Sequence, residues 1–365
     1  MDTGAQFARA GSRMTGVCGS RIRGFTVVEL MVSLTLALLI LGGLVTLFSN
    51  TSVARGEIDK SSRQIENGRF AVQMMSDEIR HAGYFGALAN PPTVPANLPD
   101  PCSTAVSAGT PDVGIGQGIG LPVQGYAGDT ALGMAATLPC LNAASGYVPN
   151  TAVLVVRRIS TAATMTPAAV ASAAAASFYV QTSGCAGDAN AYVLADGSGT
   201  YNLHAKDSTT PCLPLASAPA GPISPLFVHV YFVSSCSNKT DCTAAGANSA
   251  PTLKRMDITP GTTTVTGIAD GIENIQFEYG QDTDADGAPN SYSTTTTLPA
   301  TPADWANVVS VRVHVLARNL DPTGGFTDSK TYALGAGTSV TPGGSFKRHA
   351  YDEVVRINNV AGRRE

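Results

Sequence analysis

Residues 25–48 read FTVVELMVSLTLALLILGGLVTLF, an apolar run of 24 residues in which Glu29 is the one charged side chain. As a helix that rises ~1.5 Å per residue, the run would span ~36 Å and could cross the ~30 Å hydrocarbon core of a bilayer. Four arginines precede the run, at positions 9, 13, 21 and 23. The positive-inside rule therefore predicts that residues 1–24 lie in the cytoplasm and that the chain after the run lies on the other side of the membrane.

Two features separate this run from an ordinary secretory signal. Such a signal has a shorter apolar core followed by small residues at its cleavage site, whereas here the small residue, Gly24, precedes the run. In addition, a carboxylate inside a membrane helix costs about 2.5–3.5 kcal/mol on insertion scales and usually has a partner. A cut between Gly24 and Phe25 would create an α-amino group one helical turn before Glu29. That amine, in the same or a neighbouring subunit, could pair with Glu29 and fix the register of packed apolar helices.

The segment from Arg23 to Leu30, RGFTVVEL, resembles the class III leader of type IV prepilins and type II secretion pseudopilins. The resemblance implies that a membrane peptidase cuts after Gly24, that the new N-terminal Phe25 is methylated, and that Glu29 guides assembly. The alternative is an ordinary signal-anchor helix with a chance glutamate. The chain departs from major pilins because no proline interrupts the helix, and Gly42-Gly43 is the expected weak point, since each glycine disfavours helix by about 1 kcal/mol.

A polar, amphipathic helix is predicted to continue over residues 51–83. A stripe of apolar or small side chains recurs on one face and predicts contact with a globular head: Ile58, Ile65, Gly68, Val72, Met75, Ile79 and Ala82. Gly83 is the expected end of this helix.

The sequences at the end of the helix and near the end of the chain indicate a particular family of pilin-like proteins. The sequence DEIRHAGYFG at residues 77–86 resembles the end of the long helix in minor pilins of the PilW type, and the pseudopilin GspJ shares a weaker version. Trp305, the strand at 308–319 and the closing RINN at residues 356–359 resemble the C-terminal part of the same family. The resemblance implies a type IV pilin-like fold.

Beyond residue 90 the chain alternates loops rich in Pro, Gly, Ser and Thr with strand-like runs. In the run 308–319, Val309, Val311, Val313 and Val315 alternate with polar residues, the pattern of a half-buried strand. Further strands are predicted at 151–159, 178–182, 226–235, 253–259, 274–279 and 350–358. Residues 90–148 and 161–177 are interpreted as loops or insertions, the second alanine-rich and compatible with a short helix. The fold class is therefore α+β: a leader (1–24), an apolar helix (25–48), an amphipathic continuation (49–85) and an antiparallel β-rich head (86–365).

Composition agrees with a chain that leaves the cytoplasm. The net charge is −4, and the leader carries +3, so the processed chain would be acidic and shows no general nucleic-acid footprint. One of seven cysteines, Cys18, lies in the leader, which leaves an even number, as disulfides in an oxidising compartment require. Six cysteines allow fifteen pairings; sequential pairing is favoured, and buried free thiols are the alternative. The six are Cys102, Cys140, Cys185, Cys212, Cys236 and Cys242.

No catalytic constellation is apparent, and the chain is not expected to be an enzyme. The histidines at positions 81, 204, 229, 314 and 349 are scattered, and the glycines at 114, 116, 118 and 120 form neither a dinucleotide fingerprint nor a P-loop. Asp282, Asp284, Asp286 and Gly287 match the first half of a calcium loop of the EF-hand type. Position 12 of that loop would be Ser293, so the bidentate glutamate is missing. The alternative is a solvated acidic turn.

These observations favour a minor pilin over an enzyme. The resemblance implies processing by a prepilin peptidase, residence in the bacterial inner membrane, and then incorporation into an extracellular type IV pilus, with roles in twitching motility and adhesion. Implied partners are other minor pilins, the major pilin, the assembly platform and a tip adhesin; no nucleic acid is expected. Two alternatives are a GspJ-like minor pseudopilin of type II secretion and a ligand-binding surface protein. The latter would need a basic or aromatic patch, and none is clear in the sequence.

Overall fold

The computed structural model describes residues 24–86, 93–105, 115–128, 137–162, 164–173, 177–206, 212, 219–294, 297–335 and 337–365. Leader residues 1–23, including Cys18, lie outside the described residues. The chain divides into two compact units, residues 1–56 and residues 57–365, which are described separately below. We call residues 57–365 the head.

The first helix, α1 (Val27–His81), has 55 residues and contributes to both units. It runs through Gly42 and Gly43 without interruption, so the weak point predicted there does not break the helix. Helix formers such as leucine and alanine surround the two glycines, and their summed propensity outweighs about 1 kcal/mol for each glycine. Nothing else lies within 4 Å of the place where a Cβ would stand at Gly42, Gly43 or Gly56.

The head contains a seven-stranded antiparallel sheet in which β5 is the central strand. One edge of β5 pairs with β2, and β2 pairs with β1. The other edge pairs with β3 near the start of β5 and with β6 near its end, because β5 is twelve residues long. The strands are β1 (Val123–Tyr126), β2 (Val153–Ile159), β3 (Phe178–Thr182), β4 (Tyr192–Ala195), β5 (Ile223–Ser234), β6 (Thr252–Thr259) and β7 (Thr262–Asp270).

A second, four-stranded antiparallel sheet has the order β13-β10-β8-β9. Its strands are β8 (Ile272–Gln281), β9 (Ser291–Tyr292), β10 (Val308–Arg318) and β13 (Arg348–Arg356). Short elements complete the described head: η1 (Ile115–Gly120), α3 (Pro167–Ser172), α4 (Pro302–Ala306), the hairpin of β11 (Tyr332–Ala333) and β12 (Ser339–Val340), and α5 (Asn358–Ala361).

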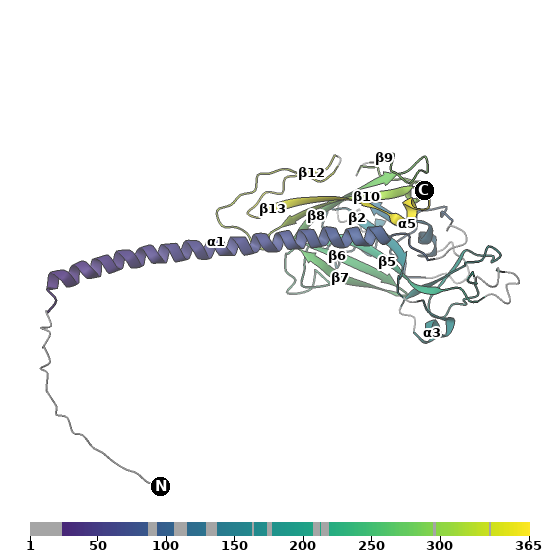
Figure 1. Ribbon diagram of the computed structural model, residues 1–365, viewed down its shortest axis with the longest axis horizontal. Helices are drawn as coiled ribbons and strands as arrows, with labels where there is room; N and C mark the ends of the chain where they lie inside the picture. The colour runs from purple at the N-terminus through teal and green to yellow at the C-terminus, as the bar shows by residue number, and fades with distance from the viewer. Residues whose placement is uncertain are drawn as a thin grey trace, which may run out of the picture. The chain divides into compact units, whose positions relative to one another are not determined.

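The end of α1 lies across strands of both sheets (Figure 1). Its buried face joins one hydrophobic core with side chains from β2, β5, β8 and β10, among them Leu154, Tyr231, Phe277 and Val311. A second core covers the other face of the seven-stranded sheet and includes Val153, Val155, Val230 and Phe232. Alternate residues of β2 and β5 therefore enter different cores, as the two-residue period of a strand requires.

The α+β class and the antiparallel head agree with the sequence prediction, and three details differ. Residues 123–126, predicted to lie in a loop, form the edge strand β1 because they pair with β2. The strand predicted at 350–358 ends at Arg356, where α5 follows. The strand β10 is buried on both faces: Ser310 and His314 are covered, and the ring of His314 packs against Gly335. The alternating sequence predicted one solvated face because it contains no information about the segment that folds over it.

Candidate functional site

The N-terminal segment shows how the first helix begins. The backbone N–H and the hydroxyl of Thr26 each donate to Glu29 Oε2 over 3.1 Å, and the N–H of Glu29 donates to Thr26 Oγ1 over 3.2 Å. This reciprocal arrangement is a capping box, which satisfies N–H groups that a helix start leaves without partners. The sequence analysis missed it, although the signal, a threonine followed three residues later by a glutamate, is present.

The predicted cleavage point lies just outside this cap. Gly24 and Phe25 precede the first helical residue, and the Phe25 side chain is 81% exposed. The bond between them therefore lies outside the helix, so a peptidase can bind it without first unfolding a helix. Cleavage itself stays a prediction.

The apolar run exposes its side chains along its whole length. From Val27 to Phe48 every large hydrophobic side chain is more than half exposed, with exposed fractions between 52% for Val32 and 76% for Val27 and Phe48. Within the described residues, α1 is the helix that is long and apolar enough to cross a membrane. Exposing so large an apolar surface to water is unfavourable in free energy, so we expect lipid or other apolar helices to surround this segment.

The head-facing stripe of α1 differs from the predicted one at its start. Val72, Met75, Ile79 and Ala82 are buried as expected, whereas Ile58 and Ile65 are 66% and 41% exposed. A seven-residue repeat rotates by about 20° per heptad around a straight helix. Three heptads before Ile79, the stripe has therefore turned away from the head by about 60°.

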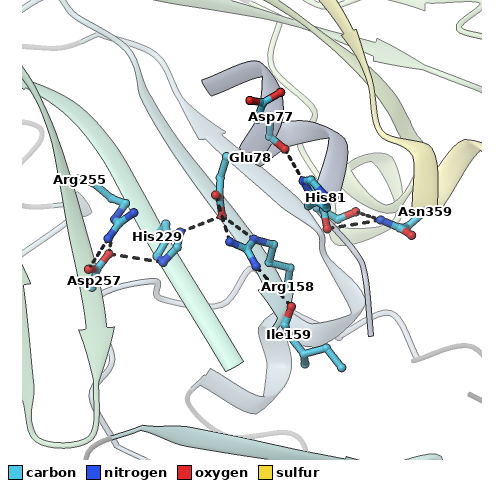
Figure 2. Close-up of polar contacts among 10 residues, drawn as sticks. Asp77, Glu78, His81, Arg158, Ile159, His229, Arg255, Asp257 and Asn359 are labelled. Atoms are coloured by element: carbon cyan, nitrogen blue, oxygen red, sulfur yellow. Dashed lines mark hydrogen bonds and ion pairs between the residues drawn. The ribbon is translucent and has the colours of Figure 1, made fainter. Parts of the chain in front are cut away.

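A buried group of charges joins α1 to the sheet, and Figure 2 shows it. Glu78 of α1 accepts from Arg158 of β2 through both of its oxygens, over 2.7 and 3.3 Å. The same carboxylate lies 2.9 Å from Nδ1 of His229 on β5. The other ring nitrogen of His229 lies 3.5 Å from Asp257, which pairs with Arg255 over 2.6 and 2.9 Å. We call these five residues the junction network.

The junction network sets the ionisation of Glu78. Burial alone would raise the pKa of its carboxyl, but the hydrogen bonds from His229 and Arg158 lower that pKa to about 2. Glu78 is therefore a carboxylate at neutral pH, held between two cationic or proton-donating partners from different strands. His229, interpreted from the sequence as an ordinary residue of a strand, is buried here as part of a structural network.

The end of α1 is fixed by residues that the family resemblance had singled out. Gly83 follows the helix with a positive φ of 71°, and a Cβ there would stand 2.8 Å from Pro122. The Gly83 N–H donates to the carbonyl of Arg157 over 2.9 Å. Asn359, from the closing RINN sequence, donates to the carbonyls of His81 and Ala82, over 3.4 and 3.2 Å. The two segments that resemble the family, residues 77–86 and 356–359, are therefore in contact in the folded protein.

The three aspartates of the predicted calcium loop lie together, with ligand atoms within 4.8 Å of one another. The buried Asp282 already has partners: its oxygens accept from the N–H groups of Ala285 and Gly287, and Arg364 lies 3.1 Å from Oδ2. Burial alone would raise the pKa of Asp282, but these contacts lower it to about 2. Asp282 is satisfied by the backbone of its own loop and by Arg364, as in the structural turn that the sequence left open as the alternative to a calcium site.

The six cysteines of the head form three disulfides in sequence order, the pairing that the sequence analysis favoured. These are Cys102–Cys140, Cys185–Cys212 and Cys236–Cys242. The last one closes a loop of six residues beside the buried Lys254, whose ammonium donates to the carbonyl of Lys239 over 2.7 Å. Among the remaining candidates, His81, His229, His314 and His349 belong to four different elements, α1, β5, β10 and β13. Gly116, Gly118 and Gly120 belong to η1, while Gly114 lies outside the described residues.

Comparison with known proteins gives one match. The family model of type IV pilus-assembly protein W (PilW) matches residues 230–359, the part of the head from the end of β5 to α5. No curated protein and no solved structure matches the chain. The matched region includes all four strands of the four-stranded sheet, Trp305, and Asn359, which caps α1. With its long N-terminal helix and antiparallel head, the chain is similar to the PilW family of type IV pilus-assembly proteins, and the family model matches it over residues 230–359.

Proposed function

We propose that this chain is a minor pilin. A prepilin peptidase cuts between Gly24 and Phe25, Phe25 is N-methylated, and residues 25–48 hold the subunit in the bacterial inner membrane. The assembly platform then draws it into an extracellular pilus together with the major pilin and other minor pilins. There it primes assembly, supports twitching motility and adhesion, and carries a tip adhesin. Its role is structural rather than catalytic.

The observation that carries this proposal is the exposed apolar helix with Glu29 at its start, in a chain whose head matches the PilW family. An apolar surface without a partner favours lateral packing against equivalent helices. A single carboxylate among apolar side chains favours one register of that packing, because it is costly wherever it lacks a partner.

Mass spectrometry of the protein's N-terminus tests the proposal, in sheared surface filaments and, separately, in membranes. We expect a peptide that starts at N-methylated Phe25 in the filament fraction. An uncut Met1 start in both fractions would contradict the central claim. Processing seen in membranes alone, with filaments that lack the protein, would favour the alternative of a minor pseudopilin.

A further inference from the structure

The head contains a pocket of about 490 Å³ that the sequence did not reveal. One wall is α1 between Ser61 and Arg69, and the other is formed by residues 326–332 and the start of β13. All of these residues belong to the head. The lining brings together cations and aromatic rings from segments more than 250 residues apart, among them Arg69, Lys330, Tyr332, Lys347, Arg348 and Tyr351. We call this the basic pocket.

The charges of the basic pocket are not balanced. Its described lining contains four Lys or Arg side chains and no Asp or Glu. Lys347 pairs with Glu57 over 2.9 Å, and Arg348 pairs with Asp328 over 2.9 Å and with Glu273. Arg69 and Lys330 are exposed and form no ion pair with any residue that the structure describes. Two cations therefore face solvent at a hollow whose other cations are already paired.

The wall of the basic pocket includes Tyr351, which is closely packed against α1. The ring of Tyr351 packs so closely on Gly68 that a Cβ at Gly68 would stand 2.3 Å from its Cε2 atom. His349 stacks edge-on against Tyr351 with ring centroids 4.6 Å apart. The Tyr351 hydroxyl is buried without a hydrogen-bond partner among the described residues. Arg69 lies near enough that its charge opposes the burial that raises the pKa of this hydroxyl. This wall therefore places one hydroxyl that has no acceptor among the described residues near the charge of Arg69.

Acceptors of the opposite charge lie at the other end of the same sheet. Asp284 and Asp286 are exposed on the loop after β8, and Asp284 has no ion pair with any described residue. The strand register separates this loop from the basic pocket. β8 ends at Gln281, opposite Val308 at the start of β10, whereas β13 begins at Arg348, opposite Arg318 at the end of β10. Eleven residues of strand span roughly 35 Å.

We propose that the basic pocket binds the acidic loop, Asp282–Asp286, of a second copy of this chain. Arg69 and Lys330 of one copy face Asp284 and Asp286 of the next, so the contact is head-to-tail. Such a heterologous contact leaves one free pocket and one free loop at the ends, and repeated without closure it generates a helical array rather than a closed dimer. The inference deepens the proposed function, because it names a lateral contact between heads in addition to the packing of apolar helices.

Sedimentation velocity of the full chain in detergent micelles tests this contact at about 50 mM and about 500 mM salt. We expect association that weakens at high salt, where screening acts over only a few ångströms. The double variant Arg69→Glu/Lys330→Glu should weaken self-association at least tenfold at low salt. The double variant Asp284→Lys/Asp286→Lys should weaken self-association to the same extent. The quadruple variant, which exchanges the charges of pocket and loop, should restore association. The apolar helix is the same in all of these proteins and contributes equally.

Lys239→Glu is the matched control, because it reverses an exposed cation that does not line the pocket, and it should leave association unchanged. Association that does not depend on salt, or a quadruple variant that stays as weak as the doubles, would overturn the proposal. A labelled single-stranded oligonucleotide is tested in parallel. Binding that requires Arg69 and Lys330, without charge-dependent self-association, would assign the pocket to a nucleic acid and also overturn the proposal. Neither result bears on N-terminal processing, which tests the proposed function separately.

Discussion

At the scale of single residues, Glu78 shows how one side chain connects three elements. It belongs to α1, and its partners Arg158 and His229 lie on β2 and β5. Its side chain is 11% exposed, and that of Arg158 is 18% exposed. Removing one member of a buried pair leaves the other charge without compensation, and this costs more than the pair itself contributes.

We expect Glu78→Gln to lower the free energy of unfolding by about 3 kcal/mol, because Arg158 would remain buried without its counter-ion. Arg80→Gln, two residues further along the same helix, is the matched control. Its partners Asp77 and Glu353 are largely solvated, so its loss should cost less than about 1 kcal/mol. Urea unfolding of both variants measures the difference. An equal loss of unfolding free energy in the two variants would show that the junction network does not anchor the helix.

The lowered pKa of Glu78 predicts a dependence on acid. Its folded pKa of about 2 lies below the ordinary 4.5, so the carboxylate stabilises the folded state above pH 4.5. This contribution decreases as the pH falls from 4.5 and is lost below about pH 2. The linked free energy is about 3 kcal/mol, from about 1.4 kcal/mol per pKa unit. The stability difference between the wild type and Glu78→Gln should therefore shrink between pH 5 and pH 2; a constant difference would contradict the assignment.

The ion pair between Asp282 and Arg364 leads to a prediction for a calcium titration. Arg364 lies 3.1 Å from Asp282 Oδ2 and supplies the positive charge that a cation would otherwise bring. We therefore expect millimolar calcium to leave the midpoint of thermal unfolding unchanged. In Arg364→Ala, which frees the carboxylate, calcium should raise that midpoint. A rise in the wild type that disappears in Asp284→Ala would instead show that calcium displaces Arg364.

At the scale of elements, α1 has a different surface in each unit. The apolar part is exposed all round, while the part in the head buries a stripe that includes Gly68. The φ of Gly68 is helical, so the position does not require the backbone freedom of glycine. It requires the absence of a side chain, because Tyr351 occupies the space where a Cβ would stand. The contact between the helix and the edge strand β13 therefore depends on this glycine.

Gly68→Ala should destabilise the head by about 1–3 kcal/mol, the usual cost of overpacking, although alanine favours helix by about 1 kcal/mol. Gly56→Ala is the matched control in the same helix, where nothing else lies within 4 Å of the added methyl group. It should be neutral or stabilising by up to about 1 kcal/mol. Thermal unfolding of both proteins provides the comparison. A stabilised Gly68→Ala would show that Tyr351 moves aside freely.

At the scale of the whole molecule, Glu29 is both a helix cap and a charge in an apolar segment. Glu29→Gln separates these roles, since glutamine also serves in a capping box but carries no charge. We expect it to reduce incorporation into sheared filaments at least tenfold while membrane levels stay the same. Thr26→Ala removes the cap and keeps the charge, and incorporation should be affected less. Immunoblots of the two fractions measure this. Equal incorporation of Glu29→Gln and wild type would exclude the proposed role in register.

The sequence by itself determined the features that depend on neighbouring residues. The apolar run, the continuation of α1 to the Gly83 stop, most strands and the acidic turn follow from composition and periodicity over short windows. The resemblance of residues 77–86 and 356–359 also pointed to the family whose model matches residues 230–359. The same local patterns predicted burial wrongly where a segment distant in the sequence determines it. They placed Ile58 and Ile65 on the buried face, and they predicted that one face of β10 is solvated.

Only the tertiary structure decided which charges meet. Glu78 and His229 are 151 residues apart in the sequence, and Lys347 of the basic pocket is 290 residues from its partner Glu57. No periodicity encodes such pairs, because their meeting depends on strand order, register and the rotation of α1 over the sheets. A basic pocket in an acidic chain is invisible in the composition for the same reason: folding gathers cations on one surface without changing the net charge.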